Sequence, residues 1–132
     1  MKSALFILTI LSLGFVACEK DSDNNYFPNG IYKGSFKRYN VAGSQEAQVT
    51  ISFDYPNWSG SSNISRYPAL GKGTFYSDNE VLKFKNTSVW TADFDWTLIL
   101  DGAYIENRKG DSLIFTRSYG DGAVDMYKLK KQ

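Results

Sequence analysis

Asp93 and Asp95 are two residues whose type and spacing could do chemistry, since they flank Phe94 and their carboxylates would share one strand face. Paired carboxylates can act as general acid and base or bind Ca²⁺. Two carboxylates are too few for a calcium site, and no catalytic or sugar-binding motif accompanies them. Hydrogen bonding on a solvated face is therefore the favoured interpretation, and a place in a ligand-binding surface is the alternative.

The composition excludes most other catalytic chemistry. The 132 residues include no His and one Cys, which excludes Ser-His-Asp and Cys-His catalysis, most zinc sites and an internal disulfide. Fifteen Lys and Arg against 14 Asp and Glu give a net charge of +1, which provides no basic field for nucleic acid. We therefore expect a monomeric binding protein that is not an enzyme, needs no metal or cofactor and binds no nucleic acid.

Aromatic side chains beside predicted turns are further candidates for a binding surface, because binding residues often lie on the loops of a rigid scaffold. Trp58 is the strongest of them, since the small polar residues 59–63 offer it little cover. Aromatic faces with nearby Asn and Asp suit stacking against sugars. Packing in the core or on a strand is the alternative for each. The candidates are Trp58, Tyr67 and Trp90, followed by Tyr39, Tyr55 and Tyr119.

The N-terminal residues have the pattern of an export signal. Lys2 gives a short positive start, and residues 4–17 are almost uninterrupted apolar side chains. A membrane-spanning helix needs about 20 such residues, whereas the apolar part of a secretory signal has about 7–15. The pattern predicts a signal peptide over residues 1–17, with an uncleaved anchor helix as the alternative.

Residues 15–18, Phe-Val-Ala-Cys, resemble a bacterial lipobox, in which signal peptidase cuts before a Cys that becomes lipid-modified through its thiol. Ala17 matches the small residue required before the Cys, and Phe15 stands where Leu is usual. The resemblance implies lipidation of Cys18 and anchoring to the outer membrane of a cell envelope. Stable anchoring takes two signals, such as the several acyl chains that the family's lipobox Cys carries.

Residues 19–25 are polar and rich in acidic side chains, so they bury little apolar surface. We therefore expect a flexible tether over residues 18–28. The run is similar to the Lys-plus-acidic signal that follows the Cys in surface-exported lipoproteins of Bacteroidetes, although Ser22 interrupts the acidic pair. The resemblance implies display at the cell surface, and a plain solvated linker is the alternative.

From Tyr26 onward, turn signals recur between short runs rich in β-branched and aromatic residues. Apolar and polar residues alternate in several runs, which places one face in a core. This pattern predicts an all-β fold over residues 29–132, an antiparallel up-and-down meander of about eight strands closing into a barrel, with a β-sandwich as the alternative. Predicted inward residues include Val49, Ile51, Phe53, Tyr55, Leu82, Phe84, Phe94, Trp96, Leu98, Leu100, Leu113 and Phe115.

Gly30-Ile31-Tyr32 resembles the Gly-x-Trp motif of the lipocalins and of small lipocalin-like bacterial domains, with Tyr32 in place of the Trp. The order of hairpins and the aromatic segment 89–96 are similar to small lipocalin-like lipoproteins of Bacteroidetes. This resemblance covers residues 29–130 and implies a non-catalytic binding module, with a small apolar ligand as a subsidiary expectation. A surface glycan-binding accessory protein is the alternative function.

The inward candidates bear on whether such a barrel has room for a ligand. An eight-stranded barrel is either filled by its own side chains or holds one small ligand. Each aromatic side chain buries about 150–250 Å². Bulky residues therefore predict a mostly filled interior, and they are Tyr32, Phe36, Phe53, Phe75, Phe84 and Trp96.

Two short features lie near the C-terminus. Asp111-Ser112-Leu113 resembles the O-glycosylation triplet of exported Bacteroidetes proteins and implies modification of Ser112, with support of a hairpin turn as the alternative. Lys128, Lys130 and Lys131 give the last predicted strand the charged finish of an edge strand. Lys37-Arg38 is a second small basic cluster. Solvation is the favoured interpretation of both clusters, and contact with anionic lipid headgroups is the alternative.

Overall fold

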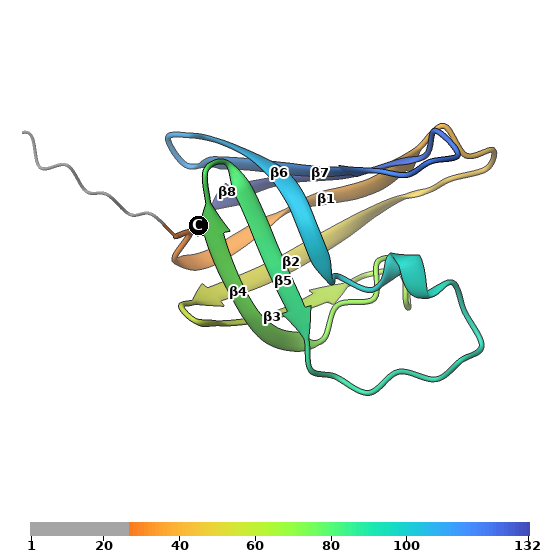
Figure 1. Ribbon diagram of the computed structural model, residues 1–132, viewed down its shortest axis with the longest axis horizontal. Coiled ribbons are helices and arrows are strands. Elements are labelled where there is room, and N and C mark those ends of the chain that lie inside the picture. The colour runs from red at the N-terminus through yellow and green to blue at the C-terminus, as the bar shows by residue number, and fades with distance from the viewer. Residues whose placement is uncertain (1–26) are drawn as a thin grey trace, which may run out of the picture.

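Residues 27–132, which the computed structural model describes, form a closed barrel of eight antiparallel strands in up-and-down order (Figure 1). The strands are β1 (Gly30–Tyr39), β2 (Glu46–Asp54), β3 (Asn57–Ser62), β4 (Lys72–Asp78), β5 (Val81–Asn86), β6 (Gly102–Lys109), β7 (Ser112–Ser118) and β8 (Val124–Lys131). The all-β meander is confirmed, and the sandwich alternative is wrong. The expected signal peptide, Cys18 and the tether up to residue 26 lie outside the described residues.

Closure of the barrel leaves the last strand without a free edge. β8 pairs with β7 on one side and with β1 on the other, and Arg38 lies directly opposite Asp125 in the β1–β8 register. The edge strand expected from the C-terminal lysines is therefore wrong. Hydrogen bonds along both sides of β8 satisfy the backbone groups that an edge would expose.

Alternation of apolar and polar side chains builds the barrel, because successive residues of a strand point to opposite faces. In β2, Ala47, Val49, Ile51 and Phe53 are buried, and the residues between them are exposed or half-buried. All eight strands contribute to one core cluster, so residues 27–132 contain the core that the barrel requires. Its strand members are Tyr32, Phe36, Ala47, Val49, Ile51, Phe53, Trp58, Phe75, Leu82, Phe84, Tyr104, Leu113, Phe115, Tyr127 and Leu129.

Aromatic rings fill the interior. Phe115 and Tyr127 stack with ring centroids 4.4 Å apart, and Tyr127 also contacts Phe36 at 4.8 Å. Further along the axis, Phe53 and Phe75 meet edge to face at 5.1 Å. These separations are those of close aromatic packing. The barrel is therefore a packed core, as the bulky inward residues predict.

Two glycines allow neighbouring strands to approach closely. A Cβ on Gly34 of β1 would lie 1.8 Å from the carbonyl oxygen of Lys128, and a Cβ on Gly73 of β4 would lie 1.8 Å from that of Lys85. No larger residue fits at such a distance without moving the backbone. These positions therefore require glycine if the strands are to bend into so small a barrel.

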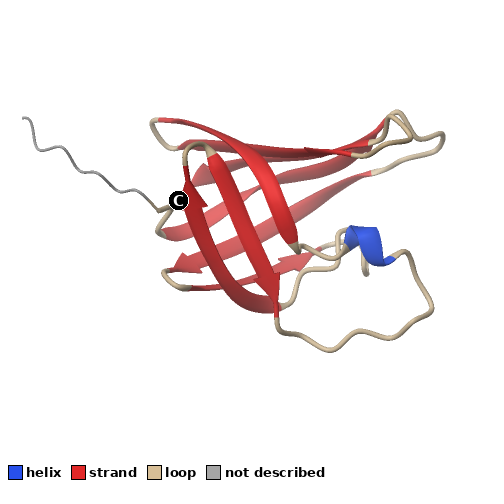
Figure 2. Cartoon of the chain, viewed as in Figure 1, coloured by secondary structure: helices blue, strands red, loops and turns tan. Residues whose placement is uncertain are grey.

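The segment that joins β5 to β6 differs from the prediction. Phe94, Trp96, Leu98 and Leu100 alternate as in a strand, yet residues 87–101 form a long loop that contains the short 3₁₀ helix η1 (Trp96–Leu98) (Figure 2). Asp95 caps this helix by accepting a hydrogen bond from the Thr97 amide, and that cap favours a helical turn over an extended strand. Trp96, predicted to point inward, is 56% exposed.

Tyr55 is a second inward prediction that is wrong. β2 ends at Asp54, so Tyr55 lies in the following turn and is 47% exposed. Its ring stacks on Phe27 with a centroid separation of 4.0 Å. The alternation of β2 therefore stops one residue earlier than the sequence pattern predicts.

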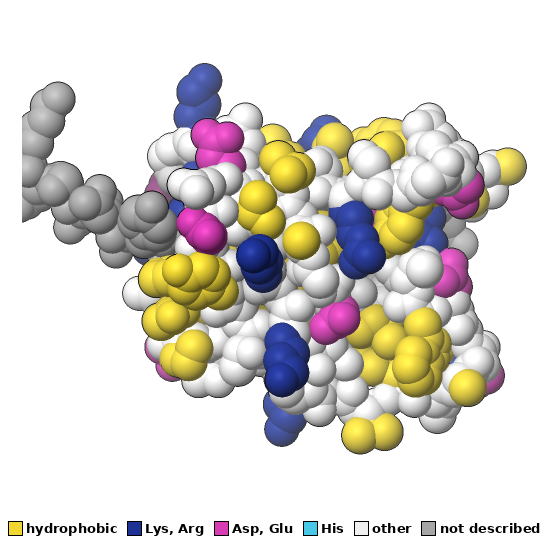
Figure 3. Space-filling model, viewed as in Figure 1, with side chains coloured by type: hydrophobic (Ala, Val, Ile, Leu, Met, Phe, Trp, Pro, Cys, Tyr) yellow, Lys and Arg dark blue, Asp and Glu magenta, His cyan; other side chains and the backbone are white. Residues whose placement is uncertain are grey.

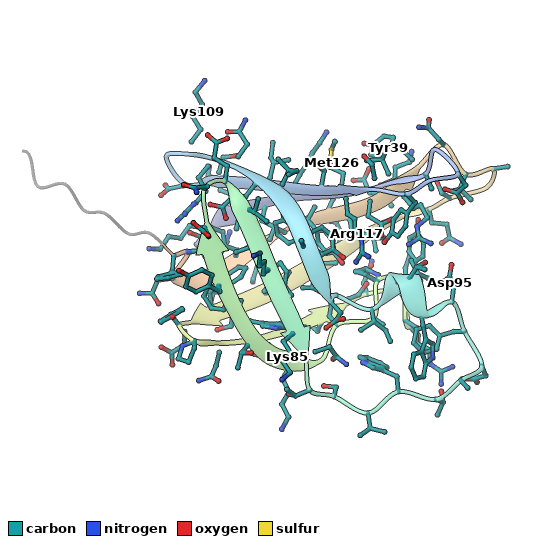
Figure 4. All side chains as sticks on the ribbon, in the orientation of Figure 1. Tyr39, Lys85, Asp95, Lys109, Arg117 and Met126 are labelled. Atoms are coloured by element: carbon teal, nitrogen blue, oxygen red, sulfur yellow. The ribbon has the colours of Figure 1, made fainter. Side chains whose placement is uncertain are left out.

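The two ends of the barrel are built differently. One end, called here the Phe27 end, holds Phe27 and the tight connections after β2, β4 and β6. The other, called the loop end, holds segments 40–45, 63–71, 87–101 and 119–123. In Figure 4, Lys109 marks the Phe27 end and Asp95 marks the loop end. The longest connections therefore gather at the end far from the first described residue.

Candidate functional site

The loop 87–101 covers the loop end of the barrel and is joined to it by backbone hydrogen bonds. The Ala69 amide donates to the Leu98 carbonyl oxygen at 2.9 Å, and the Leu100 amide donates to that of Ala69 at 3.2 Å. Leu100 is buried in the core cluster, and Leu98 packs against it. The C-terminal half of the loop therefore closes this end of the barrel.

A buried ion pair lies beneath the loop. Arg38 donates from Nε to Asp125 Oδ1 at 2.6 Å and from Nη2 to Asp125 Oδ2 at 2.9 Å, a two-pronged arrangement that is among the stronger hydrogen-bonded pairs. Asp125 is only 1% exposed. The hydrogen bonds to Asp125 raise the pKa of Arg38 despite its burial. Because the two residues face each other in register, the pair ties β1 to β8 at this end.

Two more side chains extend this ion pair to the loop. Arg38 Nη1 donates to Asp95 Oδ2 at 3.0 Å. The Tyr119 hydroxyl lies 2.8 Å from Asp125 Oδ2 and 3.1 Å from the Thr97 carbonyl oxygen, both within hydrogen-bond distance. Burial and the hydrogen bond to Asp125 raise the pKa of Tyr119 to about 12. One connected network thus holds the loop, β1 and β8 together.

Asp93 and Asp95 do not form an acid–base pair. Hydrogen bonds from Thr97 lower the pKa of Asp95, and hydrogen bonds from Thr91 and Arg66 lower the pKa of Asp93. Both carboxylates are therefore ionised near neutral pH and hold the loop. The prediction that the two carboxylates share one face of a strand is wrong, because this segment is a loop. The hydrogen-bonding interpretation is confirmed.

Aromatic side chains form the outer surface of the same loop. Phe94 contacts Trp90 edge to face at 5.9 Å, and the Arg66 guanidinium lies 5.3 Å from the Phe94 ring centroid. Trp90 donates from Nε1 to Asn86 Oδ1 at 3.2 Å. Trp96 donates from Nε1 to the Thr91 carbonyl oxygen at 2.8 Å while half of its surface stays open to solvent. Hydrogen bonds thus fix both indole rings on the loop.

Exposed hydrophobic side chains of this loop form a patch on the surface of the molecule. Val89 is 98% exposed, and hydrophobic side chains gather over the long loop in Figure 3. Trp96, Arg66 and Asp93 bring an aromatic face, a guanidinium and a carboxylate to this loop end. We call Trp90, Phe94, Trp96, Arg66 and Asp93 the loop surface.

Trp58, the strongest sequence candidate for a binding role, is not part of it. Its side chain is 2% exposed and contacts Phe84 edge to face at 5.7 Å. Its indole N–H is buried without a hydrogen-bond acceptor among the described residues. The small polar residues around it, including Ser59 and Ser61, point outward and leave the ring in the core. The prediction of an exposed Trp58 is wrong.

The remaining sequence candidates lie at different places. Tyr67 is half-buried at the loop end, where its hydroxyl accepts a hydrogen bond from the Arg38 amide at 3.3 Å and its ring packs on Phe36. Ser112 is the first residue of β7, half-buried beside its hairpin turn, and its modification stays a prediction. The structure therefore brings Tyr67, Trp90, Asp93 and Asp95 to one end of the barrel.

The sequence pattern does not identify Arg66, Asp125 or the exposed position of Trp96 at this end, and the expected solvation of Arg38 is wrong, because Arg38 is buried in its ion pair with Asp125. Arg38 lies two residues from the buried Phe36 on β1, and Asp125 lies two residues from the buried Tyr127 on β8, so both point to the inside of the barrel. A charged residue at an inward position on each of two strands is therefore the signal that could have found the ion pair. Its use requires the β1–β8 register, which the sequence pattern does not provide.

No group of three or more metal-ligating side chains is gathered within residues 27–132. In the same part of the chain, no helix has the length and apolar character needed to cross a membrane. Comparison of the sequence and structure with protein-family models, curated proteins and solved structures finds no match in any of the three.

Proposed function

We propose that the protein is a non-catalytic binding module, anchored to the cell envelope by a lipid on Cys18, that binds its ligand at the loop end. The observation that carries this proposal is the contrast between a filled interior and a loop that presents Trp96 to solvent. Binding surfaces of this kind combine a rigid scaffold with exposed loop residues. The eight-stranded barrel supplies the scaffold.

The packing inside the barrel argues against a small apolar ligand in the interior. Phe36, Phe53, Phe115 and Tyr127 are each at most 1% exposed and contact other rings across the interior. A ligand there would have to displace side chains whose burial stabilises the fold. The loop surface needs no such displacement, because its groups are already exposed or half-buried.

The chemistry of the loop surface favours a saccharide as ligand. Trp96 offers an indole ring for stacking, and Arg66 and Asp93 offer a donor and an acceptor for hydroxyl groups. The indole is fixed by its bond to Thr91, and the Asp93 carboxylate is fixed by Thr91 and Arg66. A surface fixed before binding loses little conformational entropy on binding.

The position of Phe27, the first described residue, supports an anchored role. Phe27 lies at the opposite end from the loop surface, and Cys18 precedes it by nine residues. Nine extended residues span at most roughly 30 Å. A lipid on Cys18 would hold the barrel close to the membrane.

Affinity electrophoresis in gels containing host or dietary polysaccharides tests the ligand class with residues 25–132. Wild-type protein should be retarded by at least one polysaccharide. Trp96→Ala should bind about tenfold more weakly, since it removes the exposed ring. Tyr76→Ala is the matched control, because Tyr76 is a 49% exposed aromatic on the wall near Phe27 and should bind as wild type.

Lack of retardation on every polysaccharide, or equal weakening by both variants, would contradict a saccharide site on the loop. The anchor is tested separately by labelling cells with a fatty-acid probe. The full chain should be labelled and Cys18→Ala should not. A Cys18→Ala chain that still carries the label would rule out the lipid anchor.

A further inference from the structure

Four lysines, Lys33 and Lys37 of β1 and Lys128 and Lys130 of β8, lie at outward positions of two neighbouring strands. Lys33 stands directly opposite Lys130, and Lys128 stands opposite Ser35, two residues further along β1. Strand geometry therefore places the four side chains on one side of the barrel wall. We call them the lysine face.

Acidic side chains do little to neutralise this face. Among the cross-strand partners of the four lysines on β1, β2, β7 and β8, only Glu46, opposite Lys37, is acidic. No ion pair within residues 27–132 includes any of the four lysines. The inward charges of the same two strands, by contrast, cancel in the Arg38–Asp125 pair. Positive charge is thus concentrated on the outside of β1 and β8.

Such an arrangement does not help the barrel to fold. Like charges directly opposite each other on neighbouring strands destabilise the pairing. The chain as a whole carries a net charge of only +1, so the cluster is a local feature and not a consequence of composition. A negatively charged partner would remove the repulsion between Lys33 and Lys130.

Apolar side chains are interspersed with these lysines. Ile31, on the outward side of β1, is 50% exposed, and Tyr39 and Met126 are half-buried outward residues of the same two strands. The Lys37 ammonium lies 5.3 Å from the Tyr39 ring centroid. Basic side chains mixed with apolar ones are typical of surfaces that lie on anionic membranes.

The place where the chain enters the barrel brings this face near a bilayer. β1 begins at Gly30, beside Lys131 at the end of β8, and Phe27 lies three residues earlier. A short tether gives an intramolecular contact an effective concentration near the millimolar range, so weak attraction suffices. This step rests on the lipid anchor of the proposed function.

We propose that the lysine face binds the anionic headgroups of the membrane in which the lipid on Cys18 inserts. Contact through this face lays the barrel on its side, with the axis along the membrane surface. The loop surface at the barrel end then stays open to solvent. The attraction between these lysines and the headgroups adds to the anchoring by the lipid and fixes the orientation of the binding module.

Flotation with lipid vesicles tests this contact on residues 25–132, which lack Cys18 and therefore do not depend on lipidation. The protein should bind vesicles that contain phosphatidylglycerol and should not bind vesicles of phosphatidylcholine alone. Binding should disappear in high salt, because exposed charges are screened within a few ångströms there. Lys33→Gln/Lys130→Gln should lower the partition coefficient about 25-fold, or fivefold per lysine.

The control carries the same change in net charge on another side of the barrel. Lys83 and Lys85 are exposed on β5, which lies across the closed barrel from β1 in strand order. Lys83→Gln/Lys85→Gln should bind phosphatidylglycerol vesicles within about twofold of wild type. The Lys33→Gln/Lys130→Gln variant should melt no lower than wild type, because a repulsive pair is lost.

Three results would overturn the proposal. They are absence of binding to phosphatidylglycerol vesicles, equal loss of binding in both double variants, and preference for a soluble acidic polysaccharide over the vesicles. The last result would assign the lysine face to a polyanion other than the membrane. Failure of fatty-acid labelling with intact vesicle binding would instead contradict the anchor alone.

Discussion

Each end of the barrel contains an ion pair that involves inward-facing side chains, and the two pairs differ in how completely their carboxylates are hydrogen-bonded. At the loop end, both carboxylate oxygens of Asp125 accept a hydrogen bond from Arg38, and one of them also accepts a hydrogen bond from the Tyr119 hydroxyl. Toward the Phe27 end, Glu106 Oε1 accepts hydrogen bonds from the Ser77 hydroxyl and from two nitrogens of Arg108. The other oxygen, Oε2, is buried without a hydrogen-bond partner in the described part of the chain.

The connectivity of the two pairs differs as well. Arg38 and Asp125 belong to different strands, and Arg38 reaches onward to Asp95 on the loop. Glu106 and Arg108 belong to the same strand, and the hydrogen bond from Ser77 joins Glu106 to β4, a strand of the barrel wall and not a loop. Because a buried charge is costly unless it is fully paired, the loop end is the end whose polar interior is organised to hold a loop in place.

The largest expected effect comes from Asp125→Ala, which leaves Arg38 buried without its main partner. Removing one member of a buried pair costs about 3–5 kcal/mol of stability. Chemical denaturation should show this loss as a lower midpoint. The double variant Arg38→Met/Asp125→Leu should recover most of it, since well-packed apolar side chains can replace such a pair. A single variant as stable as wild type would show that the network does not hold the loop end.

Glu106→Ala should cost less, about 1–3 kcal/mol, because it removes a carboxylate that is only partly satisfied. Arg108 is 26% exposed at its side chain and can be hydrated after the change. The same denaturation experiment measures both variants. If Glu106→Ala unfolds at a lower midpoint than Asp125→Ala, the ranking of the two ends is reversed.

Asp95→Ala should have a small effect on global stability, about 1 kcal/mol, because its ion pair with Arg38 is solvent-exposed on the Asp95 side. The local effect should be larger. Amide hydrogen exchange of residues 96–101 should speed up, because the variant loses both the cap of η1 and the contact with Arg38. Amides of β1 should exchange as in wild type; equal acceleration there would indicate global rather than local opening.

The smallest expected effect is a change in the structure of the loop at acidic pH. The pKa values of Asp93 and Asp95 are lower in the folded state than in the unfolded chain. Their ionised carboxylates therefore stabilise the folded loop fully above the unfolded pKa of about 3.9, and this stabilisation is lost as pH falls through the folded pKa values. Tryptophan fluorescence should therefore stay constant between about pH 5 and 8 and change below about pH 4. Asp93→Asn/Asp95→Asn should lack that change, and a transition in wild type near neutral pH would contradict the assignment.

The sequence predicts the barrel well because its evidence is local. Alternation in β2 and β7 identifies Ile51 and Phe115 as inward residues, and both are fully buried. The loop 87–101 could not be predicted in the same way, since Phe94, Trp96 and Leu98 alternate as in a strand and a single cap at Asp95 decides against it. Trp58 shows the opposite error: its small polar neighbours predict an exposed loop residue, whereas its side chain is buried in β3.

The loop-end network could not be predicted because it depends on long-range register. Arg38 and Asp125 lie at opposite ends of the domain sequence, and only closure of the barrel brings them together. Tyr67 and Trp90 are candidates because they are aromatic and lie beside predicted turns, and the structure places both at the loop end. Residue type and position thus indicate some members of the site, whereas the way in which the residues come together can be known only from the folded barrel.

Pairing of the first strand with the last also has a kinetic consequence. The β1–β8 contact joins residues separated by almost the whole domain, and such non-local pairing slows folding. A chain that emerges from a ribosome or a translocation channel with its N-terminus first cannot close this seam until β8 is free. Until that moment β1 and β7 each keep an open edge, which favours aggregation. Release of the final strand is therefore the step that allows the barrel to close.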